Sequence, residues 1–194
     1  MGIETMVFTE QDIKQLLQEA LQQAQSRPDT GETTQKINLN RSQSWVKALA
    51  EQLNRRYEGD TDIRIFTKSD YSNRRDFGLN ELLYDILVCM VGEVESSVHK
   101  KKLCFIKEVL WQVESEFAHN TRSALVDFNK LVLGSGKNKL FIAAQVKKGT
   151  ESSFLKVLQP AAGYCIGDVY VGMIPHPANW GDIENTVHLW VFKK

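Results

Sequence analysis

The sequence has no excess of either charge and no long apolar segment. It contains 24 basic and 24 acidic residues among 194, so its formal net charge is zero. This balance excludes a generally basic protein that coats nucleic acid, although charge can still be segregated locally. No apolar run reaches the roughly 18 residues of a transmembrane helix, so no membrane partner is expected. The first residues lack the basic and apolar regions of a secretory signal, which predicts a cytoplasmic protein.

Paired cysteines and the common catalytic motifs are also lacking. The three cysteines, Cys89, Cys104 and Cys165, are odd in number and show no CxxC spacing. This pattern argues against a disulfide framework or a zinc site and predicts buried, reduced thiols. The sequence shows no Walker-type loop, no GxGxxG and no Ser/His/Asp pattern. Nothing therefore points to a nucleotide-binding loop or a serine hydrolase.

The N-terminal segment predicts a helix followed by a linker. Thr9 and Asp12 have capping-box spacing, and the apolar residues that follow recur at helical intervals. Residues 26–38 are polar, contain Pro and Gly, and show no periodicity. We therefore predict that residues 1–38 form a helical appendage, which can mediate a homodimer. Residues 39–194 are predicted to form a single α/β domain.

The remaining chain alternates between the two kinds of periodicity. Helical spacing predicts helices over 44–57, 121–133 and 152–164. Strands are predicted over 62–67, 81–94, 103–117, 139–146, 169–173 and 187–192, with an exposed hairpin connection at 96–102. This order predicts an α/β fold with a central mixed sheet flanked by helices.

Two predicted strands carry an unusual set of carboxylates. Asp85 is the only charged residue in the apolar run 82–90. In the strand 109–117, alternation places Gln112, Glu114 and Glu116 together with Leu110 on one face. A hairpin between the two strands can bring Asp85 beside Glu114 and Glu116. Clustered carboxylates repel one another unless a cation holds them, and Mg²⁺ or Mn²⁺ suits such oxygen ligands. The same spacing also fits a solvated stripe on a half-exposed strand, with Asp85 at the surface.

The order of elements, with an Asp-bearing strand hairpinned to a Glu-x-Glu strand, resembles the PD-(D/E)XK nuclease family over residues 41–146. The resemblance implies a restriction-endonuclease-like core in which Asp85 and Glu114 bind Mg²⁺ or Mn²⁺. Glu116 stands where the family usually has a lysine that assists the attacking water. The resemblance then implies that Asp85, Glu114 and Glu116 are catalytic.

Four further residues are supporting candidates, two by the same resemblance and two by strand alternation. Lys130, in the next helix, can replace the missing lysine, as in relatives whose lysine has moved to a helix. Glu51 lies on the helix before the first strand, where the family often has an extra metal ligand; a solvated role is its alternative. Glu81 shares the alternation of Asp85, and Gln112 shares the face of Glu114, where it can support the site or contact the substrate.

The sequence therefore predicts a Mg²⁺-dependent nuclease that hydrolyses phosphodiester bonds in DNA, of restriction or defence type. Two alternatives remain open. The missing motif lysine and the zero net charge favour a catalytically inactive member of the same fold that binds nucleic acid or protein. The Gln-rich N-terminal helix favours an oligomeric scaffold.

Overall fold

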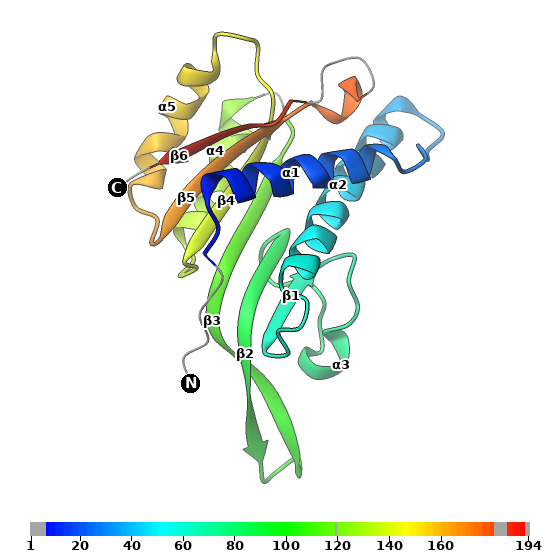
Figure 1. Cartoon of the computed structure of the whole chain (residues 1–194), viewed down its shortest axis with the longest axis vertical. Coiled ribbons are helices and arrows are strands. Elements are labelled where there is room, and N and C mark those ends of the chain that lie inside the picture. The colour runs from blue at the N-terminus through cyan, green and yellow to red at the C-terminus, as the bar shows by residue number, and fades with distance from the viewer. Residues whose placement is uncertain (1–6, 119, 181–185, 193–194) are drawn as a thin grey trace.

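The computed structural model describes residues 7–118, 120–180 and 186–192 and contains a six-stranded mixed sheet between two layers of helices (Figure 1). The predicted α/β class, with a mixed sheet flanked by helices, is thus confirmed. The helices are α1 (Glu10–Gln25), α2 (Thr34–Arg56), α3 (Arg74–Phe77), α4 (Thr121–Val132), α5 (Glu151–Ala162) and the 3-10 turn η1 (Pro177–Asn179). The strands are β1 (Ile63–Thr67), β2 (Ile86–Ser96), β3 (Lys101–Glu116), β4 (Asn138–Ala144), β5 (Asp168–Ile174) and β6 (His188–Phe192).

The strands lie in the sheet in the order of the chain, β1-β2-β3-β4-β5-β6. β1, β2 and β3 form an antiparallel meander, whereas β3, β4 and β5 are parallel and β6 is antiparallel to β5. Parallel neighbours need crossover connections, and α4 and α5 provide them. The end of β3 therefore meets the first crossover helix, α4, directly.

Alternating side chains divide the core between the two faces of the sheet. On one face, α1 and α2 pack on residues such as Ile86, Val88 and Val113. On the other, α4 and α5 pack on residues such as Leu87, Phe141 and Val171. Among the described residues, none of the helices is long and apolar enough to cross a membrane.

The first helix is part of this core and not a separate appendage. The predicted capping box is present, because Thr9 Oγ1 accepts from the Asp12 amide at 3.1 Å and the Thr9 amide donates to Asp12 Oδ2 at 2.9 Å. Six apolar side chains of α1 are at most 2% exposed: Ile13, Leu16, Leu17, Ala20, Leu21 and Ala24. This stripe is covered by α2 and the sheet of the same chain. The structure thus leaves no free apolar stripe on α1 for a homodimer.

The second helix begins ten residues before the predicted start at residue 44. α2 starts at Thr34, and Thr33 Oγ1 accepts from the Lys36 amide at 3.2 Å as its N-cap. The predicted domain boundary at residue 38 consequently falls inside a helix. Sequence reasoning missed this first part because residues 34–43 are mostly polar and show no apolar stripe. Arg41 fixes it instead, by pairing with Asp29 at 2.6 Å and donating to the Pro177 carbonyl at 2.6 Å.

β2 and β3 are longer than the strands beside them. β1 pairs with β2 only from Ile86 to Met90, and β4 pairs with β3 only from Trp111 to Glu116. Beyond these limits β2 and β3 continue as a two-stranded ribbon that projects from the molecule (Figure 1). We call residues 92–107 the arm.

Candidate functional site

Asp85 lies at the end of the sheet opposite to the arm. It immediately precedes β2, one residue beyond the last ladder pair of β2 and β3, Ile86 with Val113. Its Oδ2 accepts from the Ser115 amide at 2.9 Å and from Ser115 Oγ at 2.5 Å. These two bonds anchor the carboxylate to the middle residue of the Glu-x-Glu motif. The hairpin thus brings Asp85 to the end of β3, as the sequence predicts.

Glu114 is buried on the α4 side of β3, with 2% of its surface exposed. Oε2 pairs with Lys130 Nζ at 3.2 Å, whereas Oε1 has no hydrogen-bond partner among the described residues. Burial, with a further contribution from the charge of Asp85, raises the pKa of Glu114 to about 8. Asp85 is bonded to Ser115, the residue that follows Glu114 in β3, so the two carboxyl groups belong to the same end of the strand. A buried carboxyl oxygen without a partner is costly, so a proton or a bound ion at this position would stabilise Glu114.

Lys130 is brought to Glu114 by α4. Its ammonium contacts both Glu114 and Asp127, the latter at 2.8 Å one helical turn away. Burial lowers the pKa of Lys130, but the hydrogen bonds and charges of Asp127 and Glu114 outweigh burial and the net shift is upward. Lys130 is therefore cationic and pairs with the buried carboxyl group of Glu114.

Asp127 belongs to the site although sequence reasoning did not single it out. It contacts Lys130, and its charge raises the pKa values of Glu114 and Glu116. The sequence could have indicated this role, because Asp127 stands three residues before Lys130 and beside Phe128, which belongs to the apolar stripe of the same helix. Helical spacing identified that stripe, but not which polar neighbours would face the sheet.

Glu116 is half-buried at the end of β3 and accepts from the Ala118 amide at 2.6 Å. Burial, together with Asp127, raises its pKa above the ordinary value, while the Ala118 amide works in the opposite direction. Glu116 therefore binds a proton more readily than an ordinary glutamate.

A cleft of about 530 Å³ opens beside Asp85 on the α2 side. Glu81, Asp85, Glu116 and Lys68 are among the residues that line it. Thr67 also lines it, and Thr67 Oγ1 is buried without a partner among the described residues. The structure thus brings Glu81 to the same cleft as Asp85. The cleft has space for a ligand larger than a hydrated ion.

Gln112 shares the sheet face of Glu114, as predicted, but it is enclosed rather than open to a substrate. It is 1% exposed, and its Oε1 accepts from the Gly136 amide at 2.8 Å and from Lys139 Nζ at 2.9 Å. A Cβ atom at Gly134 would lie 1.6 Å from Gln112 Nε2, so this loop passes directly over the amide. Gln112 therefore holds the loop between α4 and β4 in place, and its role beside Glu114 is structural.

We expect Gln112→Leu to lower the free energy of unfolding by about 3 kcal/mol, because the backbone amide of Gly136 and the ammonium of Lys139 both lose a buried acceptor. Chemical denaturation measures this loss, and Gln22→Leu at an exposed position of α1 is the matched control. A variant as stable as the wild type would contradict this structural role.

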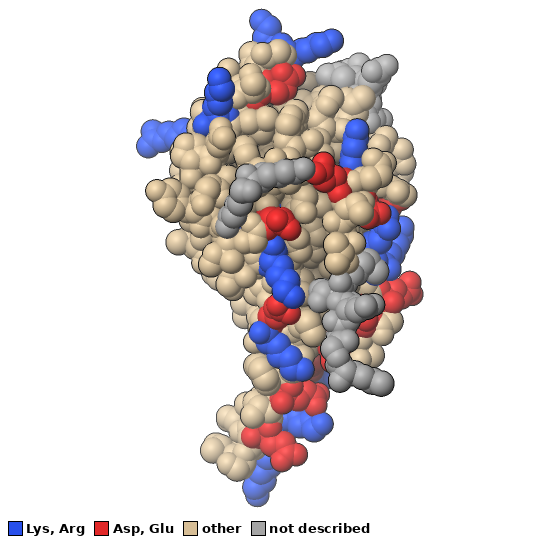
Figure 2. All heavy atoms as spheres, turned by 60° about the vertical axis from the view of Figure 1, so that its left-hand side comes forward, with Lys and Arg blue, Asp and Glu red and all other residues tan. Residues whose placement is uncertain are grey.

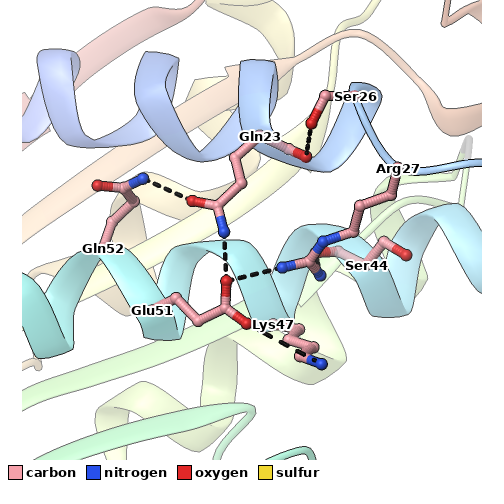
Figure 3. A network of polar contacts seen from close by, with 7 residues as sticks. All are labelled: Gln23, Ser26, Arg27, Ser44, Lys47, Glu51 and Gln52. Carbon is pink, nitrogen blue, oxygen red and sulfur yellow. Dashed lines mark hydrogen bonds and ion pairs between the residues drawn. The ribbon is translucent and has the colours of Figure 1, made fainter.

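The structure does not bring Glu51 to the other carboxylates. Although α2 also contributes to the cleft wall, Glu51 points from α2 towards α1 (Figure 3). There Oε2 pairs with Arg27 at 2.7 Å and accepts from the Gln23 amide, and Oε1 lies 4.0 Å from Lys47. Glu51 fastens the two helices together, which corrects its assignment as a supporting site residue. A helical wheel places Glu51 off the apolar stripe but cannot show that a second helix covers that side.

The donor set fits a hard cation only in part. Asp85 and Glu114 supply carboxylates, and Glu114 Oε1 is a buried oxygen without a partner among the described residues. Within residues 7–118, 120–180 and 186–192, no group of three or more His, Cys, Asp or Glu side chains is arranged to hold an ion. Mg²⁺ commonly retains several waters and uses one or two carboxylates, so a two-carboxylate site fits its coordination habits.

The molecule is thus an α/β protein with a six-stranded mixed sheet and a carboxylate-rich site where β2 begins and β3 ends. Comparisons with protein-family models, with curated proteins and with solved structures give no match to this chain.

Proposed function

We propose that the chain is a Mg²⁺- or Mn²⁺-dependent nuclease of the PD-(D/E)XK type that hydrolyses phosphodiester bonds in DNA. The observation that carries the proposal is the pair formed by Asp85, anchored on Ser115, and Glu114, whose buried Oε1 has no partner among the described residues. Asp85 and Glu114 would hold the ion. When bound, the ion makes a water more acidic and stabilises negative charge on the phosphate.

The residues around this pair have separable tasks. Lys130 fixes the Glu114 carboxylate and adds positive charge near the phosphate. Glu116 accepts a proton from the attacking water as the water oxygen bonds to phosphorus. The bond from phosphorus to the leaving ester oxygen breaks, and that oxygen takes a proton from solvent. Lys68, in the cleft wall, provides a contact for a neighbouring phosphate.

The decisive test compares Asp85→Asn and Glu114→Gln with the wild type. Both variants keep the shape of the side chain but lose its charge, so Mn²⁺ affinity should fall by more than about tenfold in isothermal titration. Cleavage of supercoiled plasmid should fall to background in Mg²⁺ or Mn²⁺. Glu51→Gln is the matched control: it removes a carboxylate that faces α1 and should retain both metal binding and cleavage.

Two results would contradict the proposal. The first is equal Mn²⁺ affinity in the wild type and in Asp85→Asn. The second is intact plasmid after incubation of the wild-type protein with either metal.

One observation favours a second function, a catalytically inactive member of the same fold. Lys130 already pairs with Glu114 Oε2, so an internal cation can take the place of a metal ion. In that case the wild type would bind no Mn²⁺ and would still bind nucleic acid or protein. The apolar stripe of α1 is covered within the chain, so a scaffold built through this helix would use its exposed Gln-rich face.

A further inference from the structure

Among the residues that the structure describes, the arm is a two-stranded ribbon without a third strand on either side. Its residue pairs run from Gly92 with Phe105 to Ser96 with Lys101, and β1 and β4 stop before it. At about 3.3 Å per residue, the paired part extends roughly 15 Å beyond the rest of the sheet. A projection of this kind adds almost nothing to the core and leaves both of its faces open to a partner.

Directly paired residues share a face of the ribbon, and the two faces differ in charge. One face, which we call the lysine face, carries Lys101 and Lys107. Its apolar residues are Val94 and Phe105, which are about half exposed, and Leu103, which is partly buried. Lys107 lies in a register shift, and its side chain passes over Gly92, which places it on this face. No Asp or Glu belongs to the lysine face.

The acidic residues of the arm lie on the opposite face. Glu93 and Glu95 stand there with Lys102, and Glu93 pairs with Lys102 at 2.8 Å. Figure 2 shows basic and acidic side chains along the whole projecting ribbon. Among the described residues, Lys100, Lys101 and Lys107 have no ion-pair partner, whereas the arm has one such acid, Glu95. The arm therefore offers three unneutralised lysines at its tip and on one face.

We propose that the arm binds B-form duplex DNA, with the lysine face against the phosphates that border the major groove. This inference rests on the proposed nuclease function for the nature of its ligand. The major groove of B-DNA admits a two-stranded β-ribbon, whereas the deep, narrow major groove of duplex RNA does not. The unpaired lysines complement the phosphate charge, and the apolar side chains between them can contact thymine methyl groups.

The position of the arm fits a single duplex that also reaches the carboxylates. β2 has 11 residues from Ile86, next to Asp85, to Ser96 near the arm tip. At about 3.3 Å per residue this is roughly 35 Å, close to one helical turn of B-DNA. The arm and the carboxylate site would therefore contact the same side of the duplex one turn apart.

The test measures binding, without cleavage, of a fluorescent duplex of about 20 base pairs in EDTA by anisotropy at several salt concentrations. The arm variant carries Lys100→Gln, Lys101→Gln and Lys107→Gln. It should bind at least about tenfold more weakly, and its salt dependence should flatten by roughly 0.9 per lysine removed. The matched control carries Lys14→Gln, Lys36→Gln and Lys156→Gln, three exposed lysines outside the arm, and should bind like the wild type.

Four results would overturn the proposal: no binding of the duplex by the wild-type chain, equal losses in the arm and control variants, equal affinity for duplex RNA, or a change of molecular mass in solution caused by the arm variant. The last would show that the arm joins two copies of the chain, or that its lysines prevent such edge pairing. Because this assay does not depend on cleavage, it tests the arm proposal independently of the nuclease proposal. Arm-dependent binding with no cleavage in Mg²⁺ overturns the nuclease alone, and cleavage with unchanged binding of the arm variant overturns the arm alone.

Discussion

Deletion of residues 1–38 is expected to leave a chain that does not fold cooperatively. α1 contributes six side chains that are at most 2% exposed to the core between the helices and the sheet. The deletion also removes the beginning of α2, which starts at Thr34. Without α1, an apolar face of the sheet and of α2 would be exposed to water. The free energy of apolar burial lost in this way exceeds the few kcal/mol by which small domains are stable. Thermal unfolding followed by circular dichroism measures the effect.

A single substitution tests the same packing more gently. Leu17 is fully buried, and its Cδ1 lies close to Gly172 of β5. Leu17→Ala should therefore lower the free energy of unfolding by about 2–5 kcal/mol. Lys14→Ala, at an exposed position of the same helix, should change it by less than about 0.5 kcal/mol. A deletion variant with a sharp thermal transition near that of the wild type would contradict the placement of α1 in the core.

Glu114→Gln is expected to stabilise the protein above about pH 8, in the absence of divalent metal. Burial raises the pKa of Glu114 from 4.5 to about 8, so between these values the folded state binds a proton that the unfolded state has released. The resulting stability is fully present below pH 4.5 and is lost as the pH rises through about 8. From the size of the shift, the loss amounts to a few kcal/mol. Glutamine cannot ionise, so the Glu114→Gln variant should not lose stability in this way.

Urea unfolding between pH 5 and pH 9 in EDTA measures this difference. The wild type should lose stability over this interval, whereas the slope for Glu114→Gln should be smaller. Glu58→Gln, at an exposed position, should follow the wild-type curve. Parallel curves for the wild type and Glu114→Gln would show that Glu114 is already ionised in the folded protein at neutral pH.

Alternation along β3 predicted part of the site correctly and failed at one position. Gln112, Glu114 and Glu116 share a face, as period two requires. Leu110, predicted on that face, instead packs in the core of Trp111 and Val113. A register shift lies between the pairs Cys89 with Val109 and Val88 with Trp111, and such a bulge reverses the orientation of the preceding side chains. Sequence alternation alone does not reveal a bulge.

The sequence alone determined most of the helices and strands, although not the start of α2 or the short helix α3, and the meeting of Asp85 with the Glu-x-Glu motif. These follow from local periodicity and from the short hairpin between β2 and β3, which limits how the two strands can pair. Only the tertiary structure decided that α1 lies in the core, that Glu51 pairs with Arg27, and that Asp127 joins Lys130 beside Glu114. Each depends on which helix covers which face of the sheet. That choice is made by packing between segments far apart in the chain, which no local pattern records.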